Sequence, residues 1–460
     1  MSGIAELLAN LGYEVSGSDA RRSEVTDRLQ TLGVRVLQGH DAAHVGPADV
    51  VVVSSAIRRG NPEVEAAAAR HIPVIPRAEM LAELMRLRFG IAVAGAHGKT
   101  STTSMVALVL ERAGLDPTAV IGGRLSAFGS NARLGRGELM VAEADESDRS
   151  FLKLSPAIAV ITNLDREHME SYGSWETLQD AFVDFANKVP FYGAVVACAD
   201  DDAVRTILPR ITRRVITYGL ADGDGAADAE VRGENLELEA FGSRATITQR
   251  LSGGGRTRLG DLRLRVPGRH NMLNALAAVA VATELEVPFD RMAAALEEFR
   301  GAERRFELRG EERGVMVVDD YGHHPTEIGA VIAAARAGIG RRVVVVFQPH
   351  RYTRTSQLLT EFVTALARAD QIVLTDIYAA GELPIPGVTI EALADAVRAA
   401  APGRVHLIKP LEALPAAVAS LARPGDLVIT LGAGSIGTTP ERILAALRAS
   451  RTSGPEGQQS

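Results

Sequence analysis

Short apolar runs rich in valine and isoleucine alternate with alanine-rich stretches of helical pattern along most of the chain. Short continuous apolar runs are typical of strands that are covered on both faces, as in a parallel sheet between helices. The sequence therefore predicts an α/β fold throughout. In such a fold ligands bind beyond the carboxyl ends of the strands, so the residues that follow each apolar run are the candidates for function.

The apolar runs and a change of pattern divide the chain into three sections, and we expect domains at residues 1–88, 89–301 and 302–460. The expected strands lie at 13–16, 50–54, 90–94, 138–143, 157–162, 193–197, 315–318, 343–347, 372–375, 405–408 and 427–430. Between residues 235 and 249 apolar and polar residues alternate, which is typical of antiparallel strands with one solvated face. The polar end at 452–460 is expected to fray.

Composition excludes several classes of protein. Lysine and arginine number 50 and aspartate and glutamate 57, and the net charge of −7 gives no general attraction to nucleic acid or to an anionic membrane. Any phosphate binding must therefore be local.

The single cysteine, Cys198, excludes an intramolecular disulfide and suits a reducing compartment. No apolar run is long enough for a membrane span, and residues 1–12 lack the features of a leader. We expect a cytoplasmic protein without nucleic-acid or membrane partners.

Residues 91–101 (IAVAGAHGKTS) combine an apolar strand, a tight turn and the start of a helix expected over residues 100–112. Gly114 follows that helix as a stop signal. In this arrangement backbone N–H groups and a helix N-terminus face an anion. A tight strand-to-helix turn without a ligand is the alternative interpretation.

The residue types in this turn favour the phosphate interpretation. Gly98, Lys99 and Thr100 match the end of the phosphate-loop pattern, in which lysine reaches the β- and γ-phosphates and the hydroxyl binds magnesium. The first glycine of that pattern is absent, because Val93 stands in its place. The strand before the turn and the helix after it are both expected, as the pattern requires.

Two polar clusters follow the strands expected at 138–143 and 157–162. Their members are Glu143, Asp145, Glu146, Asp148, Asn163, Asp165, His168 and Glu170. Because the carboxyl ends of parallel strands meet at one edge, we expect both clusters on the same edge as Lys99. Oxygen-rich ligands suit a hard cation such as magnesium. Solvated loop acids are the alternative.

Histidine and arginine concentrate at the same kind of junction. The histidines that follow an expected strand or precede an expected helix are His97, His168, His270, His323, His324 and His350. For any one of them a structural role is at least as common as a catalytic one. Arg351 and Arg354 follow the strand at 343–347 with the spacing of one helical turn, which suits a grip on a carboxylate or phosphate. Pairing with surface acids is the alternative.

Together these motifs resemble the Mur ligase family of peptidoglycan synthesis from end to end, and in particular the branch that uses L-alanine. The matching segments are SGSD at 16–19, GAHGKTSTT at 95–103, EADESD at 143–148, GRHNMLNA at 268–275, RRFE at 304–307, DDYGHHPTE at 319–327, FQPHRYTRT at 347–355, DIYAAGE at 376–382 and LGAGSIG at 431–437. Several of these segments together are highly specific.

The resemblance implies a fold and an activity. The fold would comprise a Rossmann-like N-terminal domain for the UDP sugar, a central P-loop ATPase-like domain with a parallel sheet and a small antiparallel side sheet, and a Rossmann-like C-terminal domain that binds the amino acid and closes over the site. The activity would be ligation of L-alanine to the lactyl carboxylate of UDP-N-acetylmuramate through an acyl phosphate, with ATP and Mg²⁺. A monomer or weak homodimer is implied.

The resemblance also implies roles for individual residues. The catalytic residues would be Lys99, His323, His324, Arg351 and Arg354. The ATP-binding residues would be Gly95, Ala96, His97, Gly98, Lys99, Thr100, Ser101, Asn271, Asn274, Arg305 and Asp320. The substrate-binding residues would be Ser18, Asp19, Ser54, Ser55, His168, His350, Arg351 and Arg354, and the magnesium ligands Thr100, Glu143 and His168. Within these sets, Asn271 and Asn274 would meet the adenine, and Arg351 and Arg354 the alanine carboxylate.

The chain departs from the family pattern at three places. Ala96 stands where the family usually has threonine, so one hydroxyl is missing from the phosphate loop. Lys188 falls about where sibling ligases carry a carboxylated lysine that bridges the magnesium ions, and the same modification is a hypothesis here. The sequence begins with a helical segment at residues 1–10, where the family has first a strand and a glycine-rich loop for the UDP diphosphate, so we expect a weakened UDP site.

Three other functions compete with this one. A sibling ligase that joins a recycled murein tripeptide to the same sugar shares the central motifs, but it typically lacks the segments PHRYTRT and DDYGHHPTE as they stand in this sequence. A dinucleotide-dependent dehydrogenase would need a GxGxxG after a strand, and none follows an expected strand. A nucleotide-binding protein without catalysis would give the acidic and arginine clusters no function.

Overall fold

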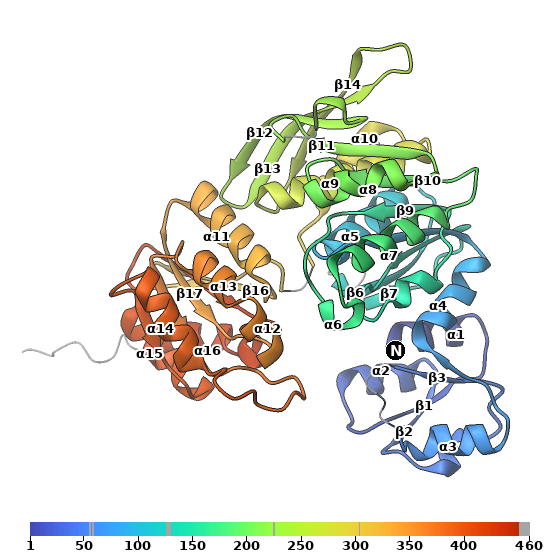
Figure 1. Cartoon of the computed structure of the whole chain (residues 1–460), viewed down its shortest axis with the longest axis horizontal. Coiled ribbons are helices and arrows are strands. Elements are labelled where there is room, and N and C mark those ends of the chain that lie inside the picture. Colours follow the sequence, from blue (N-terminus) through green and yellow to red (C-terminus); the bar gives the residue numbers. More distant parts are fainter. Residues whose placement is uncertain (55–56, 58, 126–129, 224–225, 303, 450–460) are drawn as a thin grey trace, which may run out of the picture. The chain divides into compact units, whose positions relative to one another are not determined.

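A computed structural model gives the fold of the chain and describes residues 1–54, 57, 59–125, 130–223, 226–302 and 304–449 (Figure 1). The chain forms two compact units. The first comprises Met1–Leu236, Ala245–Arg263 and Asn271–Phe299, and the second Glu237–Arg244, Leu264–His270 and Arg300–Ser460. Most of the first two sections of the sequence thus lies in one unit, and the division into three domains stays a prediction. The polar end at 452–460 lies outside the described residues.

The N-terminal part of the first unit consists of short parallel strand pairs joined by helices. Its elements are α1 (Ser2–Asn10), β1 (Ser16–Asp19), α2 (Glu24–Thr31), β2 (Arg35–Gln38), η1 (Ala42–Val45), β3 (Val51–Val53), α3 (Pro62–Ala69), β4 (Val74–Pro76) and α4 (Arg77–Arg86). Strand β1 pairs with β2 and β3 with β4, in two separate sheets. The strand predicted at 13–16 is wrong in position, because the ladder to β2 fixes Ser16–Asp19 as the extended segment and Tyr13 is exposed.

A ten-stranded sheet forms the body of the first unit, in the order β14-β13-β12-β11-β10-β9-β5-β8-β6-β7. Its strands are β5 (Phe89–Ala94), β6 (Thr118–Leu125), β7 (Ser130–Arg133), β8 (Leu139–Glu143), β9 (Ile158–Ile161), β10 (Ala194–Cys198), β11 (Val215–Leu220), β12 (Val231–Glu239), β13 (Gly242–Arg250) and β14 (Arg256–Leu264). Its helices are α5 (Lys99–Arg112), η2 (Ser150–Lys153), α6 (Met169–Tyr172), α7 (Trp175–Asn187), α8 (Asp202–Ile207), η3 (Leu208–Arg210), η4 (Ala226–Asp228), α9 (Arg269–Glu284) and α10 (Phe289–Glu298).

The alternating segment at 235–249 forms strands β12 and β13, as predicted, but these are not a separate side sheet. Strand β12 also pairs in parallel with β11, so β12, β13 and β14 continue the central sheet. The alternation of apolar and polar residues in a strand indicates which face is solvated, but it does not identify the strand with which it pairs. The pairing of β12 with β11 could therefore not be predicted from the sequence. The α/β character of the fold is confirmed.

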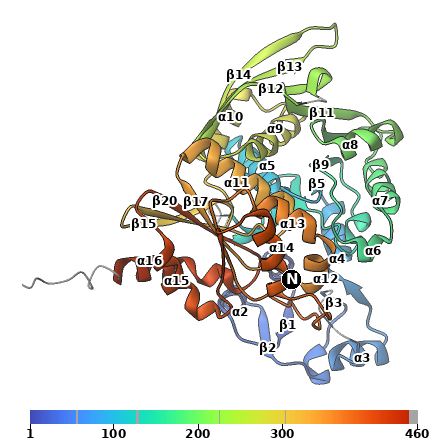
Figure 2. The ribbon, with the colours of Figure 1, turned by 60° about the vertical axis from the view of Figure 1, so that its left-hand side comes forward.

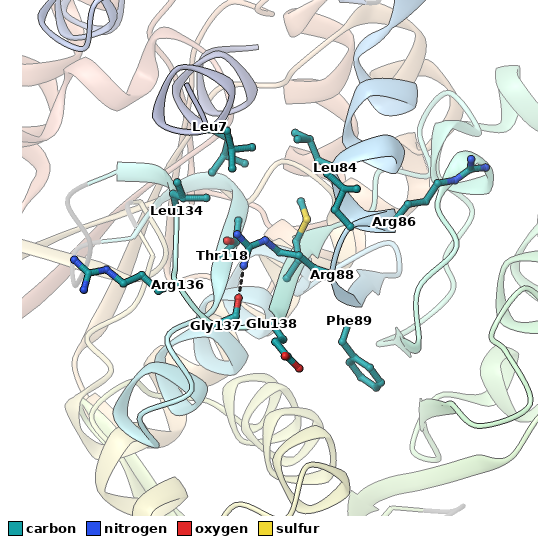
Figure 3. Close-up of a pocket in the computed structure, with 13 residues that line it drawn as sticks. Leu7, Leu84, Arg86, Arg88, Phe89, Thr118, Leu134, Arg136, Gly137 and Glu138 are labelled. Atoms are coloured by element: carbon teal, nitrogen blue, oxygen red, sulfur yellow. Dashed lines mark hydrogen bonds between the residues drawn. The ribbon is translucent and has the colours of Figure 1, made fainter. Parts of the chain in front are cut away.

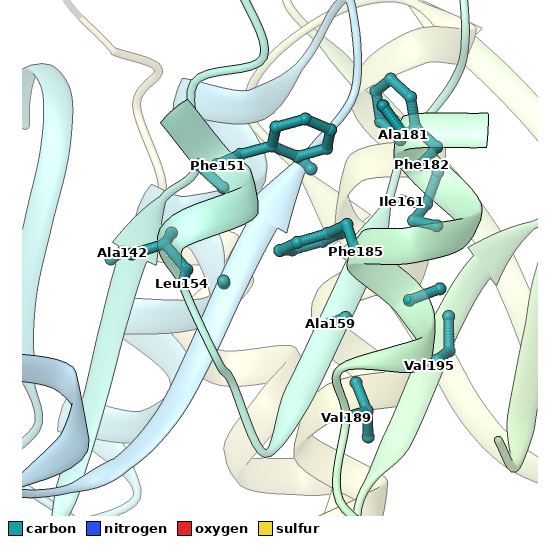
Figure 4. Close-up of a cluster of buried hydrophobic side chains, with 14 of the residues drawn as sticks. Ala142, Phe151, Leu154, Ala159, Ile161, Ala181, Phe182, Phe185, Val189 and Val195 are labelled. Atoms are coloured by element: carbon teal, nitrogen blue, oxygen red, sulfur yellow. The ribbon is translucent and has the colours of Figure 1, made fainter. Parts of the chain in front are cut away.

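One face of the central sheet is held by a cluster of aromatic side chains. Phe151, Phe182 and Phe185 are buried, and the ring of Phe151 lies 5.1 Å, centre to centre, from each of the other two (Figure 4). The last two rings come from α7, whose apolar face covers side chains of β9 and β10 such as Ile161 and Val195. This packing fixes the strands whose carboxyl ends carry the candidate site.

The second unit contains a six-stranded sheet in the order β15-β16-β20-β17-β18-β19. Its strands are β15 (Glu307–Glu312), β16 (Val315–Asp320), β17 (Arg342–Phe347), β18 (Gln371–Leu374), β19 (Val405–Leu407) and β20 (Asp426–Leu431). Its helices are α11 (Pro325–Ile339), α12 (Tyr352–Gln357), α13 (Leu359–Leu366), α14 (Ile390–Ala400), η5 (Leu411–Ala413), α15 (Leu414–Leu421), η6 (Ser435–Thr438) and α16 (Pro440–Ala449). All pairs except the antiparallel pair β15–β16 are parallel.

Both faces of this sheet are covered, as continuous apolar strands predict. Helices α11, α13 and α14 pack on one face, and α15 and α16 on the other (Figure 2). Alternate residues of β17 divide between the two sides, with Val343 and Val345 in one cluster and Val344 and Val346 in the other. No helix among the described residues has the length and apolar character for a membrane span.

Candidate functional site

The predicted phosphate loop connects the buried strand β5 to the start of α5. Gly98 precedes the helix with a φ of 79°, a left-handed conformation that glycine adopts without strain. A Cβ built on Gly98 would lie 2.5 Å from Oδ1 of Asn274, and one on Gly95 would lie 2.1 Å from Oγ1 of Thr162. Both positions therefore require glycine. The turn leaves the first N–H groups of α5 at the loop, the arrangement that favours an anion.

The neighbouring strand β9 fixes the shape of this loop. Asn163 accepts a hydrogen bond from the backbone N–H of His97 at 2.7 Å and donates one to its carbonyl at 2.9 Å. Thr162 donates to the same carbonyl at 2.7 Å, and the His97 ring contacts Asp165 at 2.9 Å. Two residues directly after β9 thus hold His97 in place.

Lys99 is the first residue of α5 and folds back across the loop. Its Nζ donates to the carbonyls of Gly95 at 2.7 Å and Ala96 at 3.1 Å, and to Oε1 of Glu146 at 2.8 Å. Burial opposes the charge of the ammonium, but the carboxylates of Glu146 and Glu143 outweigh it and raise the pKa of Lys99. Burial also raises the pKa of Glu146 to about 7, against the attraction of Lys99. The lysine is a largely buried cation at the start of a helix, with its side chain 15% exposed.

Thr100 and Glu143, both predicted as magnesium ligands, lie in contact. Oγ1 of Thr100 donates to Oε2 of Glu143 at 2.9 Å, and the backbone N–H of Gly122 donates to the same oxygen at 2.8 Å. Strands β5 and β8 are parallel neighbours, so the loop and the end of β8 meet at one edge. A hydroxyl beside a carboxylate is a donor set that fits a hard divalent cation.

A second group of donors comes from the segments that follow β8 and β9. Ligand atoms of Glu146, Glu167 and His168 all lie within 4.8 Å of one another. Oε2 of Glu146 is buried and has no hydrogen-bond partner among the described residues. An orphaned buried carboxylate oxygen beside a histidine is compatible with a second cation, so the residues present fit the predicted role of His168.

Helix α9 supplies the predicted adenine residues. Asn271 and Asn274 are buried, and Oδ1 of Asn274 accepts a hydrogen bond from Thr102 at 3.1 Å. Asn274 also lies against Gly98, so it supports the phosphate loop. Ser101 is buried on α5 beside Thr102. Contact of Asn271 and Asn274 with adenine stays a prediction.

In the second unit, Glu327 organises the turn that carries His323 and His324. Its Oε2 accepts hydrogen bonds from the backbone N–H of His323 at 3.0 Å and of His324 at 3.3 Å. Its Oε1 accepts from Arg305 at 3.1 Å. Glu327 stands three residues after His324, the N-cap of α11, which is the capping-box spacing. The predicted ATP-binding residue Arg305 thus pairs with an acid of its own unit.

Asp320 and its neighbour Asp319 are buried anchors of the same region. Asp320 accepts hydrogen bonds from the backbone N–H of Gly322 at 2.6 Å and Phe306 at 2.7 Å. Burial raises the pKa of Asp320 to about 6, and the charge of Arg305 only partly offsets this. The structure shows Asp320 holding the loop, and its predicted role toward ATP stays a prediction.

Arg351, Arg354 and His350 follow β17, at the carboxyl edge of the second sheet. Arg351 is the N-cap of α12 with a φ of 72°, so it precedes the helix, and Arg354 lies within its first turn. The backbone N–H of Arg351 donates to the carbonyl of Tyr378 at 2.8 Å, and the His350 ring stacks on Tyr378. Burial, then the charges of His323 and Arg354, lower the pKa of His350 to about 4. This junction presents two guanidinium groups beside a neutral imidazole.

His270, the remaining histidine of the predicted set, lies in the first turn of α9. Burial, then the charge of Arg305, lower its pKa to about 4. A Cβ at Gly268 would lie 2.6 Å from this ring, so the chain packs closely around it. A neutral, closely packed ring is what a structural histidine shows.

The predicted substrate residues of the N-terminal part lie at two strands. Ser18 donates to Glu63 at 2.8 Å and contacts the His40 ring at 3.1 Å, while Asp19 accepts from the backbone N–H of Arg21 at 3.1 Å. Ser54 follows β3 directly. Ser55 lies outside the described residues.

Lys188 lies at the other edge of the sheet from the predicted magnesium ligands. It is the C-cap of α7, which starts after the carboxyl end of β9 and returns to the amino end of β10. The charges that act on it are those of Asp184 and Lys153, of which Lys153 precedes β9. The hypothesis that a carboxylated Lys188 bridges the magnesium ions is therefore wrong: it ends at the opposite edge of the sheet from Glu143.

A cavity of about 510 Å³ also lies at that opposite edge (Figure 3). It is lined by the first residues of β5 and by residues of α1 and α4, among them Phe89, Leu7 and Leu84. Arg88 reaches across it to the carbonyl of Gly137, whereas the guanidinium groups of Arg86 and Arg136 point outward. The cavity is separate from the phosphate loop, which follows the other end of β5.

Several residues of the site were not singled out from sequence. Glu167 and Thr162 lie in the candidate region of the first unit and Glu327 in that of the second, and only Glu327 had a signal, its capping-box distance from His324. Glu146 and Asn163 were seen as members of acidic or polar clusters, but pattern alone could not assign them a partner. The contact of Gly122 with Glu143 involves a backbone N–H, which leaves no trace in residue type.

Comparison with known proteins agrees with this geometry. The Mur ligase family, catalytic domain, matches residues 1–89, the Mur ligase middle domain residues 93–282, and the Mur ligase, glutamate ligase domain, residues 304–434. A UDP-N-acetylmuramate--L-alanine ligase of Myxococcus xanthus is 54% identical over 97% of this chain and 93% of its own length. The namesake enzyme of Geobacter sulfurreducens is 52% identical over 98% of this chain and 96% of its own.

Among solved structures, the UDP-N-acetylmuramate-alanine ligase of Thermotoga maritima is 28% identical, with a TM-score of 0.79 over 98% of this chain and 97% of its own. These findings define the class of protein: the chain is an ATP-dependent ligase. It belongs to the Mur ligase family.

Proposed function

We propose that this enzyme ligates L-alanine to the lactyl carboxylate of UDP-N-acetylmuramate, with conversion of ATP to ADP and phosphate. The observation that carries the proposal is the loop in which Lys99 begins α5 and Thr100 meets Glu143. The names of relatives more than 50% identical over nearly the whole chain support the choice of substrates.

The chemistry requires activation of the acid. A carboxylate is a poor electrophile because it is already anionic. Attack of one carboxylate oxygen on the γ-phosphorus forms an acyl phosphate and releases ADP. The alanine amine then attacks the acyl carbon, the tetrahedral intermediate expels phosphate, and the amine proton passes to a base or to water. The oxygen that attacked phosphorus leaves with the phosphate.

Residues of the first unit suit the phosphoryl transfer. Lys99 and the N–H groups at the start of α5 would bind the phosphates and offset the charge that develops on them. Thr100, Glu143 and His168 would hold magnesium, which when bound neutralises phosphate charge. Gly95, Gly98 and His97 keep the loop in shape, and Asn271 and Asn274 would meet the adenine.

Residues of the second unit suit the amino acid. Arg351 and Arg354 would bind the alanine carboxylate, and a guanidinium pairs with a carboxylate through two parallel hydrogen bonds. His323 and His324 would act near the γ-phosphate. The neutral ring of His350 leaves the positive charge at this junction on the two arginines. Holding the amine in place would convert a bimolecular attack into an effectively intramolecular one.

We further propose that the enzyme works in the cytoplasm as a monomer or weak homodimer, without nucleic-acid or membrane partners. A single cysteine, the buried Cys198, suits a reducing compartment. The test of compartment is fractionation of cells with an antibody to the protein. Sedimentation at several concentrations tests the oligomeric state.

The activity is tested by phosphate release from ATP. We expect release only when UDP-N-acetylmuramate, L-alanine and magnesium are all present, with one UDP-N-acetylmuramoyl-L-alanine formed per phosphate. Release without the two acceptors would point to a plain ATPase. Faster turnover with a murein tripeptide than with L-alanine would favour the sibling activity.

A further inference from the structure

Glu146 is a buried carboxylate next to Lys99, and apart from its place beside Glu167 and His168 in the candidate cation cluster, the proposed reaction gives it no role. Its side chain is only 4% exposed, and its Oε1 accepts the hydrogen bond from Lys99 Nζ at 2.8 Å. The backbone around it is fixed as well, since its carbonyl accepts a hydrogen bond from the buried Tyr172 hydroxyl at 2.6 Å. The carboxylate is thus held beside the phosphate loop.

With this contact, the Lys99 ammonium makes three hydrogen bonds to acceptors of the protein itself. An ammonium has three donors. Two of them go to the carbonyls of Gly95 and Ala96 within the loop, and the third goes to Glu146. A polyphosphate can use this ammonium only if it replaces at least one of the three.

Stability does not account for burying Glu146. Its Oε2 has no hydrogen-bond partner among the described residues, and an unsatisfied buried oxygen costs folding free energy. A buried ion pair is often no more stabilising than apolar residues of the same shape. The contact with Lys99 therefore calls for another explanation.

We propose that Glu146 is a positioning residue that holds Lys99 over the loop in the absence of nucleotide and competes with the phosphates of ATP and ADP for its ammonium. This inference rests on the proposed use of ATP. Glu146 lowers the affinity for nucleotide in two ways. It accepts a hydrogen bond from the ammonium that the phosphates need, and its negative charge repels phosphate at close range. The enzyme thereby binds nucleotide more weakly than the same loop would without the Glu146 carboxylate, and ADP dissociates faster.

The test is nucleotide affinity in Glu146→Gln, which keeps the shape and an acceptor oxygen but removes the charge. We expect the Kd for ADP and the KM for ATP to fall together by about 5-fold or more, the lower end of common coupling between sites. The KM values for L-alanine and UDP-N-acetylmuramate should not change. Glu146→Asp, which keeps the charge, should bind ADP nearly as the unmodified enzyme does.

Two further variants keep the test decisive. Glu176→Gln removes an exposed acid at the start of α7 and should leave ADP binding unchanged, so a general charge effect would show there. Glu146→Met is a second uncharged variant of similar size, to be used if the glutamine variant does not fold. Equal or weaker ADP binding in a folded uncharged variant would overturn the inference while wild-type turnover still supported the ligase. Absence of ADP binding and turnover in the wild type would overturn both.

Discussion

The hydroxyl of Thr100 donates a hydrogen bond to the carboxylate of Glu143 at 2.9 Å, although the two residues are 43 positions apart. The contact joins the start of α5 to the end of β8, because β5 and β8 are parallel neighbours whose carboxyl ends meet. It brings a hydroxyl and a carboxylate to the place where a phosphate loop needs its magnesium ion. The pair is therefore the natural point at which to test the metal site.

Thr100→Val should raise the magnesium concentration needed for half-maximal activity by about 10-fold to 100-fold, the usual range for groups at a metal site. Valine keeps the shape but removes the donor oxygen. Steady-state rates across a magnesium titration measure the effect, and Thr100→Ser should restore it. Ser104→Ala is a matched control, because the Ser104 hydroxyl is buried in the same helix and has no hydrogen-bond partner in the part of the chain that the structure describes. An unchanged magnesium requirement in Thr100→Val would remove Thr100 from the site.

Gly98→Ala should weaken ATP binding more than it destabilises the fold. Alanine in the left-handed region costs about 1–2 kcal/mol, and here its Cβ would also meet Asn274 at 2.5 Å, which must displace the loop. Gly114→Ala is the control, since its φ of 84° imposes similar strain, while a Cβ there would meet no atom of the described residues within 4 Å other than those of its chain neighbours. Thermal denaturation should show similar losses in both variants, whereas the KM for ATP should rise only in Gly98→Ala. An equal rise of the KM for ATP in both variants would mean that the effect does not depend on the loop at Gly98.

Arg351→Ala should raise the KM for L-alanine by about 10-fold or more, because a charge-assisted hydrogen bond contributes about 1.5–3 kcal/mol. The KM for ATP should change little. Arg351→Lys should recover only part of the loss, since lysine keeps the charge but lacks the planar fork. Arg398→Ala removes an exposed arginine on α14 and serves as control. The role of Arg351 would be refuted by an unaltered KM for L-alanine.

The folded state should lose stability at mildly acidic pH through His350. Its pKa is lowered from 6.5 to about 4, first by burial and then by His323 and Arg354. The folded state therefore holds the ring neutral, and the contribution is complete above pH 6.5 and lost as pH falls toward about 4. Urea denaturation at pH 7.5 and pH 5 should show a larger loss for the wild type than for His350→Gln. Equal losses would mean that the ring titrates normally.

The repeating pattern of the sequence was sufficient for the α/β fold and for the edge at which the site lies. Apolar runs identified β5, β8 and β9, and parallel pairing then placed the acids that follow them beside Lys99. Strands with weaker apolar character were missed, such as β6 with its two glycines and the edge strand β7. Their extended form depends on pairing with neighbours, which local residue types do not encode.

Residue identity predicted which side chains belong to the site better than it predicted their partners. Lys99 and Thr100 were found from the loop pattern, but the choice of Glu146 as the partner of Lys99 depends on the exact path of the chain after β8. Lys188 shows the opposite error. Its place in the sequence suggested a metal role, and the length of α7 carries it to the wrong edge of the sheet.

The most direct test of the proposed reaction follows an oxygen atom. UDP-N-acetylmuramate labelled with ¹⁸O in the lactyl carboxylate is incubated with ATP, magnesium and L-alanine, and the released phosphate is analysed by mass spectrometry. Activation through an acyl phosphate predicts one ¹⁸O in each phosphate, none in ADP, and no labelled phosphate with Lys99→Ala. Unlabelled phosphate released by the wild-type enzyme during amide formation would contradict the account.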